Sequence, residues 1–220
     1  MARMFHDALA RLGGDPLITH YDQDSRIELS GQTFLNWVMK TANLVEELDV
    51  DPAEPIALGL SDTDPGHWVS LIWVAAAWFT GGHAVQGVPD GAELAVVGPE
   101  DPRRGRATVA CTLHPLGRGF DEVPAGAIDY ADVLTQPDLA LPGSPASEDP
   151  AWGDVTHGQL ADVEGRSDRR LFVDPHCGWE FLRDALVAPV VGGGSTVIVT
   201  GLDAGEVERV QTSERAVREG

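Results

Sequence analysis

The succession of apolar segments between residues 56 and 97 constrains the fold more than any other feature of the chain. A short, continuous apolar run at 56–60 is typical of a buried parallel strand. A helix is predicted over about 65–79, and further strands are predicted over 83–88 and 94–97. A strand, a helix and a strand in this order predict a crossover connection, and therefore an α/β fold with a layered sheet.

The central helix is expected to begin and end at residues that commonly flank helices. Asp62 or Asp64 is expected to cap its start, and Gly81-Gly82 is expected to end it. Its apolar run, residues 68–79, covers only about two-thirds of the length that a membrane-spanning helix needs. The helix is therefore predicted to be buried in the protein.

Three tryptophans on this helix, Trp68, Trp73 and Trp78, lie five residues apart. This spacing turns successive rings by about 500°, so the rings fan around the helix instead of forming one stripe. At least one ring is therefore expected to face outward or into a partner. Packing in the core is nevertheless the favoured interpretation for this helix.

The amino-terminal segment predicts a helix, a β-hairpin and a second helix. The first helix covers about 4–11, and the hairpin strands cover 17–21 and 26–29. Ser30 is expected to cap the second helix, on which Lys40 is predicted to face solvent. Lys40 is the only lysine in 220 residues, so any chemistry that needs a lysine depends on this one side chain.

The remainder of the chain predicts two regular blocks on either side of a loop. We predict a single α/β domain over residues 1–220, with sub-blocks at about 1–136 and 151–220. The segment 137–150 is rich in proline, serine and glycine, which indicates a connecting loop. The further predicted elements are a strand at 108–113, a short helix near 130–134, a strand at 170–174, a helix at 179–190, a strand at 195–200 and a helix at 206–215.

The charge of the chain excludes several classes of partner. Its formal net charge of −20 repels nucleic acids and anionic membranes. We therefore expect no nucleic-acid or membrane partner, whereas a second copy of the chain or another protein stays open as a partner. The first residues carry charge where a secretory signal would be apolar, so a cytoplasmic location is expected.

The cysteines and histidines carry no metal-site signature. Cys111 and Cys177 are too few for a disulfide framework and too far apart for a four-ligand zinc site, so both are predicted to be reduced thiols. His157, His176 and Cys177 have side chains that bind metals, but their spacing matches no known ligand pattern. No metal site is therefore expected.

Several short motifs occur in the order in which one enzyme superfamily carries them. Residues Thr156 to Leu160 resemble its T-H-x-N-L motif, and Asp174-Pro175-His176 resembles its P-x-x-H segment. The glycine-rich stretch from Pro189 to Ser195 resembles its x-x-G-G-x-x-V segment, and segments 29–44 and 56–82 resemble its earlier helix and its strand–helix unit. The chain is thus similar to the amino-terminal domain of the acyl- and aminoacyl-adenylate-forming enzymes. Among these it most resembles a short actinobacterial family related to AMP-binding enzymes.

This resemblance implies a layered α/β structure that corresponds to a truncated amino-terminal domain. Members of the superfamily carry a second catalytic lysine on a mobile carboxy-terminal domain, which closes over the acyl-adenylate. This sequence stops at Gly220, so no carboxy-terminal lid domain is expected. The adenosine-reading Y-G-x-T-E segment and the ribose-binding aspartate are also absent, and Lys40 lies too early in the chain to match either catalytic lysine.

The phosphate-binding loop of the superfamily is also missing. That loop is rich in serine, threonine and glycine and ends in Pro-Lys-Gly, and its amide groups and lysine stabilise the phosphate oxygens. The residues before Thr156 instead include Glu148, Asp149 and Asp154, each of which would repel a triphosphate by about 1 kcal/mol per close pair. ATP-dependent adenylation is therefore not expected, and no motif supports a nucleotide or acyl-CoA cofactor.

Four residues are candidates for binding a ligand in the remaining cleft: Thr156, His157, His176 and Cys177. No residue is assigned a catalytic role. A Cys177 thiolate at the start of a helix, with a histidine as its base, would be a nucleophile. The competing interpretation is that Asp174 caps this helix and that Cys177 packs as a small apolar side chain.

Three functions are compatible with these observations. The first is a catalytically degenerate relative of AMP-binding enzymes that binds a ligand or a protein. The alternative is a small enzyme that acts on acyl groups or thioesters in the same cleft. The third is a complementing half that docks onto a separate protein carrying the missing parts.

Overall fold

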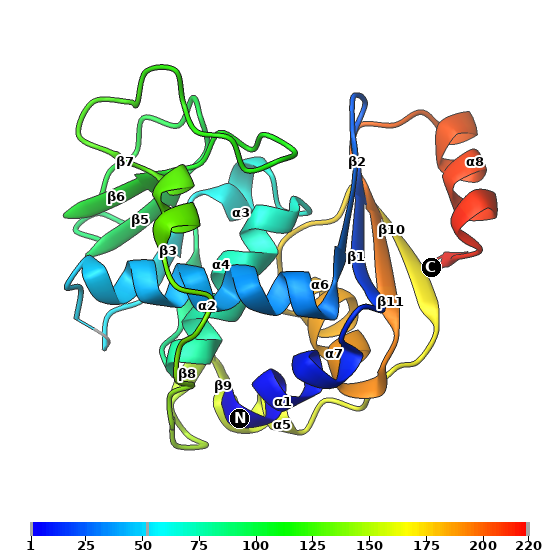
Figure 1. Cartoon of the computed structure of the whole chain (residues 1–220), viewed down its shortest axis with the longest axis horizontal. Coiled ribbons are helices and arrows are strands. Elements are labelled where there is room, and N and C mark those ends of the chain that lie inside the picture. Colours follow the sequence, from blue (N-terminus) through cyan, green and yellow to red (C-terminus); the bar gives the residue numbers. More distant parts are fainter. Residues whose placement is uncertain (1, 52, 219–220) are drawn as a thin grey trace.

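The strands of the protein form two sheets that stand side by side, with helices around them (Figure 1). The computed structural model describes residues 2–51 and 53–218. Among these residues, one sheet has five strands and the other has seven. The α/β class predicted from the sequence is confirmed.

The five-stranded sheet joins segments from both ends of the chain. Its strands are β1 (Pro16–Tyr21), β2 (Arg26–Ser30), β10 (Arg169–Val173), β11 (Ser195–Val199) and β12 (Val217–Arg218). They lie in the order β12-β10-β11-β1-β2, in which β2 is antiparallel to β1 and the other pairs are parallel. The predicted hairpin is therefore confirmed, and its first strand lies beside a strand that the chain reaches much later.

The seven-stranded sheet contains the crossover unit predicted for residues 56–97. Its strands are β3 (Ile56–Leu58), β4 (Ala84–Gln86), β5 (Leu94–Val97), β6 (Ala107–Ala110), β7 (Ile128–Asp129), β8 (Pro150–Trp152) and β9 (Val155–Thr156). The order is β7-β6-β5-β3-β4-β8-β9, so β3 pairs in parallel with both β4 and β5. Because β8 and β9 belong to this sheet and β1 and β2 to the other, both predicted sub-blocks contribute strands to each sheet.

Helix α4 (Trp68–Thr80) connects β3 to β4 and begins later than predicted. A one-turn helix, α3 (Leu60–Thr63), occupies the preceding residues, and Asp64 lies at its carboxyl end. The expected cap at Asp62 or Asp64 is therefore wrong. The cap is His67, whose Nδ1 accepts a hydrogen bond from the backbone N of Val69 at 3.2 Å. The predicted end is confirmed, since Gly81 takes the left-handed conformation with φ of 83°.

All three tryptophans of α4 are buried, with Trp68, Trp73 and Trp78 at most 1% exposed. The expectation that one ring faces outward is wrong, because each of the three rings is covered by another element of the fold. These elements are α1 (Ala2–Leu12), α2 (Gly31–Glu47) and the 3-10 helix η1 (Tyr130–Thr135). The ring pairs are Phe5 with Trp78 at 5.9 Å, Trp37 with Trp68 at 5.2 Å and Tyr130 with Trp73 at 5.3 Å between centroids.

Lys40 ties α2 to the end of η1. Its Nζ donates a hydrogen bond to the backbone oxygen of Gln136 and lies 3.5 Å from that of Leu134. Carbonyl groups at the end of a helix have no partner within the helix, and a cation satisfies them. The lysine is thus half-buried rather than free in solvent. The predicted cap of α2 is confirmed, because Ser30 Oγ accepts from the backbone N of Thr33 at 3.1 Å.

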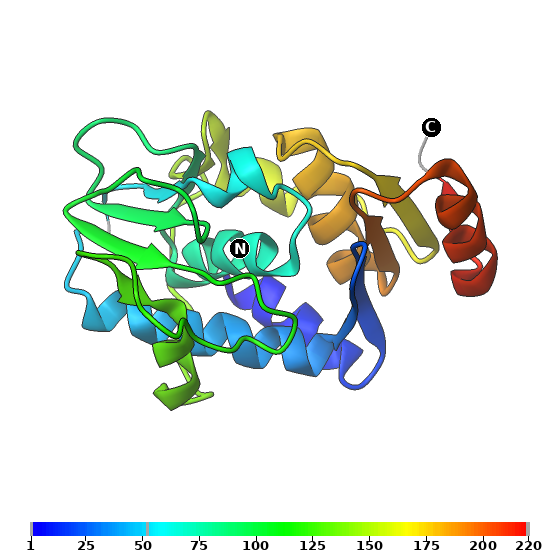
Figure 2. The ribbon, with the colours of Figure 1, turned by 90° about the horizontal axis from the view of Figure 1, so that it is seen from above.

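The five-stranded sheet lies between helices on both of its faces (Figures 1 and 2). One face is covered by a continuous helical run made of α6 (Trp179–Leu182), the π-helical turn η2 (Arg183–Val187) and α7 (Ala188–Gly192), where one helix was predicted. The other face is covered by α8 (Ala204–Glu214), whose Val207 and Val210 pack on Leu171 and Val197. Both predicted helices are therefore present.

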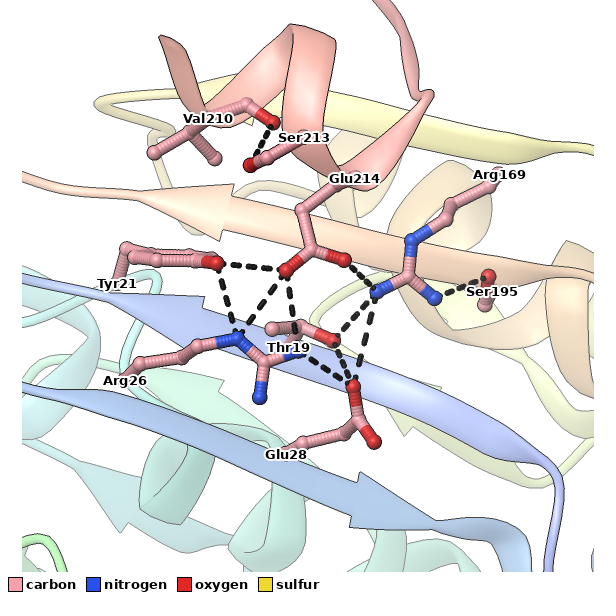
Figure 3. Close-up of polar contacts among 9 residues, drawn as sticks. All are labelled: Thr19, Tyr21, Arg26, Glu28, Arg169, Ser195, Val210, Ser213 and Glu214. Carbon is pink, nitrogen blue, oxygen red and sulfur yellow. Dashed lines mark hydrogen bonds and ion pairs between the residues drawn. The ribbon is translucent and has the colours of Figure 1, made fainter. Parts of the chain in front are cut away.

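Glu214, the last residue of α8, fastens this helix to the sheet (Figure 3). Its Oε1 accepts hydrogen bonds from the Tyr21 hydroxyl at 2.6 Å and from Arg26 at 3.0 Å, and its Oε2 accepts from Arg169 at 2.5 Å. The donors come from β1, β2 and β10, so one carboxylate links α8 to three strands.

The main hydrophobic core extends through both sheets and centres on α4. Within the described ranges, no helix has the length and apolar character that crossing a membrane requires. The segment 137–149 carries no helix or strand, as its composition predicts.

Candidate functional site

The four predicted site residues lie near opposite ends of α4. His157 binds the backbone oxygen of Gly82, just after the helix, at 3.0 Å from its Nε2. The loop that carries His176 and Cys177 instead lies before the helix, where Gly66 packs against Pro175. A helix of 13 residues is about 20 Å long, so these two pairs of residues do not form one site.

Thr156 stabilises a helix start. It caps α5 (His157–Ala161), because its Oγ1 accepts from the backbone N of Gln159 at 3.3 Å. The Gln159 side chain accepts in return from the backbone N of Thr156 at 2.9 Å, which completes a capping box. The T-H-x-N-L-like segment is thus explained by local helix formation.

His157 is enclosed by the protein. It is 1% exposed, and burial lowers the pKa of its imidazole, so the ring is neutral at neutral pH. Its Nδ1 has no hydrogen-bond partner among the described residues. An Nε2–H that donates to Gly82 is the arrangement that satisfies the carbonyl group. The side chain therefore holds the end of α4 against α5.

Cys177 packs in the hydrophobic core, 1% exposed, whereas the neighbouring His176 is exposed. Burial raises the pKa of the Cys177 thiol to about 12, so the thiol is protonated at neutral pH. The expected capping by Asp174 is wrong. Its Oδ1 accepts from the backbone N of Gly201 at 2.8 Å, and the cap residue of α6 is Gly178, which has no side chain to accept a hydrogen bond.

The carboxyl ends of the parallel strands of both sheets offer a different candidate site. Ligands of α/β sheets commonly bind beyond these ends, where the strand order reverses. In the seven-stranded sheet the order reverses at β3, and a hollow of about 410 Å³ at this point is lined by Asp64, Glu100, Asp101 and Leu113, among others. In the five-stranded sheet a hollow of about 480 Å³ follows β1 and β11 and includes Asp22 and Thr200.

A buried histidine pair lies at the carboxyl end of β1. The rings of His20 and His67 are 5.0 Å apart, and the residues are 2% and 7% exposed. Burial lowers the pKa of both imidazoles, that of His67 to about 3, although the Asp22 carboxylate opposes the shift. Both rings are therefore neutral at neutral pH. Sequence reasoning missed this pair because 47 positions separate its members and no spacing rule joins them.

The charged groups at this edge are mostly acidic. Arg103 donates to Asp101 at 2.7 Å and to Asp62 at 2.6 Å, so its charge is already matched. Burial alone would raise the pKa of Asp101, but the hydrogen bonds from Arg103 outweigh it and lower that pKa. A phosphate group at this edge would therefore meet carboxylates and no unpaired guanidinium among the residues that line the hollows.

The chain before Thr156 forms a tight hairpin. β8 and β9 are antiparallel and are joined by two residues, Gly153 and Asp154, with Gly153 in the left-handed conformation at φ of 52°. Nearby amide groups are already used. The backbone N of Gly153 donates to the backbone oxygen of Ala84 at 3.2 Å, and the backbone N of His157 donates to the backbone oxygen of Asp149 at 2.9 Å.

The described residues contain no group of three or more histidine, cysteine, aspartate or glutamate side chains placed to hold a metal ion. Cys111 and Cys177 are both buried and free. His157, His176 and Cys177 belong to no such group among the described residues.

Comparison with known proteins gives one sequence relative and many structural ones. No family model matches the chain. A protein of Mycobacterium tuberculosis (strain ATCC 25618 / H37Rv), described as a TIGR03089 family protein, is 30% identical in an alignment that covers 92% of this chain and 90% of the relative.

The solved structures that resemble the chain are larger enzymes. An acyl-CoA synthetase from Brucella canis matches with a TM-score of 0.70 and 15% identity over 97% of this chain and 46% of its own. An acetoacetyl-CoA synthetase from Streptomyces lividans matches with a TM-score of 0.71 and 16% identity over 97% of this chain and 40% of its own. The luciferase-like enzyme from the Zophobas morio mealworm matches with a TM-score of 0.72 and 10% identity over 98% of this chain and 58% of its own. The chain thus has the fold of the amino-terminal domain of adenylate-forming enzymes and spans about half the length of these structures.

Proposed function

We propose that the chain, which belongs to the TIGR03089 protein family, is a catalytically degenerate relative of the AMP-binding enzymes. It acts as a module that binds a ligand or a protein and does not form adenylates. Its fold is that of acyl-CoA synthetases and related ligases, which makes loss of their chemistry on a retained scaffold the simplest account.

The observation that carries this proposal is the two-residue turn at Gly153-Asp154. In the superfamily that the chain resembles, a long loop at the corresponding place before the T-H motif surrounds the ATP phosphates with amide groups and a lysine. A two-residue turn is too short to surround a phosphate. The carboxylates of Glu148, Asp149 and Asp154 would repel a triphosphate here.

Lys40 adds independent support. Phosphoryl and adenylyl transfer depend on cations that stabilise the developing charge on the phosphate oxygens. The only lysine of the chain donates to the backbone oxygen of Gln136 and belongs to the α2–η1 contact. It is therefore already engaged in a structural contact.

The alternative function, an enzyme that acts on acyl groups or thioesters, would use Cys177 or His176 in the cleft. The buried, protonated thiol of Cys177 and its separation from His157 argue against this chemistry. No observation on the described residues favours it over the binding module.

The proposal is tested by pyrophosphate exchange together with ligand-dependent thermal unfolding. The purified chain, incubated with ATP, magnesium and a panel of carboxylic acids, is expected to give exchange no faster than a blank without protein. A full-length acyl-CoA synthetase serves as the positive control. ATP-dependent exchange above the blank would overturn the proposal. In the thermal experiment, ATP is expected to leave the midpoint of unfolding unchanged. A ligand that binds the folded protein, at a hundred times its Kd, would raise the free energy of unfolding by about 2.7 kcal/mol and so raise the midpoint.

A further inference from the structure

A large hollow with a mostly apolar lining lies at the edge of the seven-stranded sheet opposite to the carboxyl ends of its strands. This cleft has a volume of about 890 Å³ and is bordered by the carboxyl ends of α2 and α4 and by the segment 139–143. Ile56, the first residue of β3, and His83, just before β4, lie in it. Its size is within the range of about 300–1,000 Å³ that is usual for small-molecule sites.

The floor and one wall of the cleft are apolar. Val45, Val50 and Ala77 line the floor. Leu139 and Leu141 line the wall and are 76% and 90% exposed, which is unusual for leucine side chains. Apolar surface left open in a concave site indicates a ligand with an apolar part.

The wall is held in place by specific contacts. Asn43 Nδ2 donates to the backbone oxygens of Pro137 and Leu139 at 2.8 and 3.2 Å. The backbone N of Gly143 donates to the backbone oxygen of Phe79 at 2.8 Å. A Cβ on Gly143 would lie only 2.1 Å from the backbone oxygen of Thr80, so the segment packs closely on the end of α4. The two exposed leucines are therefore presented by an ordered segment, and the cleft is a built feature of the fold.

The rim of the cleft is acidic. Glu46, Asp49, Asp51 and Glu54 line it, and all four are exposed. The one imidazole in the lining, His83, has its pKa lowered by burial, although Glu54 opposes the shift, so it adds no positive charge at neutral pH. Arg106 reaches the backbone oxygen of Asp49 from outside, with its side chain paired to Glu93. The field in the cleft is therefore negative.

We propose that this cleft binds a small amphipathic amine, with the hydrocarbon part on the apolar floor and the protonated amino group among the rim carboxylates. This inference rests on the proposed function in that it names a ligand class for the binding module. The volume selects a small molecule, the lining selects an apolar body, and the rim selects a cation.

The test compares three ligands that share one chain and differ in the head group: octylamine, octanol and octanoate. Binding to the full chain is measured by isothermal titration calorimetry at pH 7. Octylamine is expected to bind at least about tenfold more tightly than octanol, and octanoate more weakly still, because of the charge of the rim. Raising the salt concentration from about 50 to 500 mM should weaken octylamine binding and leave octanol binding unchanged.

Substitutions in the cleft lining then test whether the ligand binds in this cleft. Glu46→Gln with Glu54→Gln should weaken octylamine binding about fivefold, whereas the control pair Glu122→Gln with Glu208→Gln, which removes two charges outside the cleft lining, should not. Leu141→Ser should weaken the binding of both octylamine and octanol, and the fold should tolerate the change because Leu141 is 90% exposed.

Equal affinity for the three ligands, binding that the cleft variants do not change, or no binding of octylamine would each overturn the inference. None of these results bears on adenylation, which is measured by pyrophosphate exchange. Failure of the amine site and failure of the proposed function are therefore distinguishable.

Discussion

The hydroxyl group of Tyr21 donates a hydrogen bond to Oε1 of Glu214 over 2.6 Å, although 193 positions separate the two residues. This bond joins the first strand of the chain to the end of α8. Since Arg26 and Arg169 bind the same carboxylate, this one side chain adds polar contacts with three strands to the apolar packing of α8 on the sheet (Figure 3).

We expect Glu214→Ala to lower the free energy of unfolding by about 1–3 kcal/mol, because the change leaves the Tyr21 hydroxyl without its acceptor and removes the nearest carboxylate from Arg169 in a largely buried place. The measurement is urea denaturation followed by tryptophan fluorescence. Glu208→Ala, on the same helix but exposed, is the matched control and should change stability by less than about 0.5 kcal/mol. Equal effects of the two changes would contradict the role assigned to Glu214.

The buried His67 predicts a dependence of stability on pH. Its pKa is lowered from 6.5 to about 3 by burial, so the unfolded chain takes up a proton below pH 6.5 while the folded protein does not. His67 therefore does not reduce the free energy of unfolding above pH 6.5. Below that pH the residue lowers the free energy of unfolding by about 1.4 kcal/mol per pH unit. Urea denaturation between pH 6.5 and 5.0 avoids the range in which most carboxylates titrate.

In His67→Asn this decrease should become smaller, since asparagine keeps an acceptor for the backbone N of Val69 but does not titrate. His20→Asn should act in the same direction, because burial lowers the pKa of His20 as well. A pH dependence identical to that of the unchanged protein in both variants would show that the pair is not responsible.

The burial of Cys177 predicts a slow reaction with thiol reagents. In a Cys111→Ala background, Ellman's reagent at pH 7 should modify the folded protein no faster than the protein unfolds, because the thiol is 1% exposed and its pKa is raised to about 12. Unfolding in guanidinium chloride should restore the rate of a free thiol. Rapid labelling of the folded protein would instead support the acyl or thioester chemistry that we consider less favoured.

The sequence predicts the elements of the fold better than their surroundings. The crossover at 56–97, the hairpin at 17–29 and the end of α4 at Gly81 follow from local signals such as short apolar runs and glycine pairs. The cap of α4 was missed because α3, a single turn without a strong pattern, takes up the aspartates that would otherwise have served. Similarly, the three tryptophans are all buried because helices from distant segments cover α4, which one helix considered alone does not reveal.

The candidate site was harder to predict than the fold. Thr156, His157, His176 and Cys177 were selected from motifs, but the length of α4 separates the first two residues from the last two. The pair His20 and His67, and the cleft beside Leu139 and Leu141, depend on contacts between segments far apart in the chain. Such contacts leave no periodic or spaced pattern that a sequence reading detects.

The position of β1 in its sheet has a consequence for how the protein acquires its structure during synthesis. β1 lies between β2 and β11, so one of its two hydrogen-bonding edges stays unsatisfied until residues 195–199 have been made. A nascent chain therefore carries an open strand edge until residues 195–199 have emerged, and closing the sheet requires a contact of long sequence separation, which slows folding. We expect the ribosome-bound chain to resist protease only after these residues have emerged.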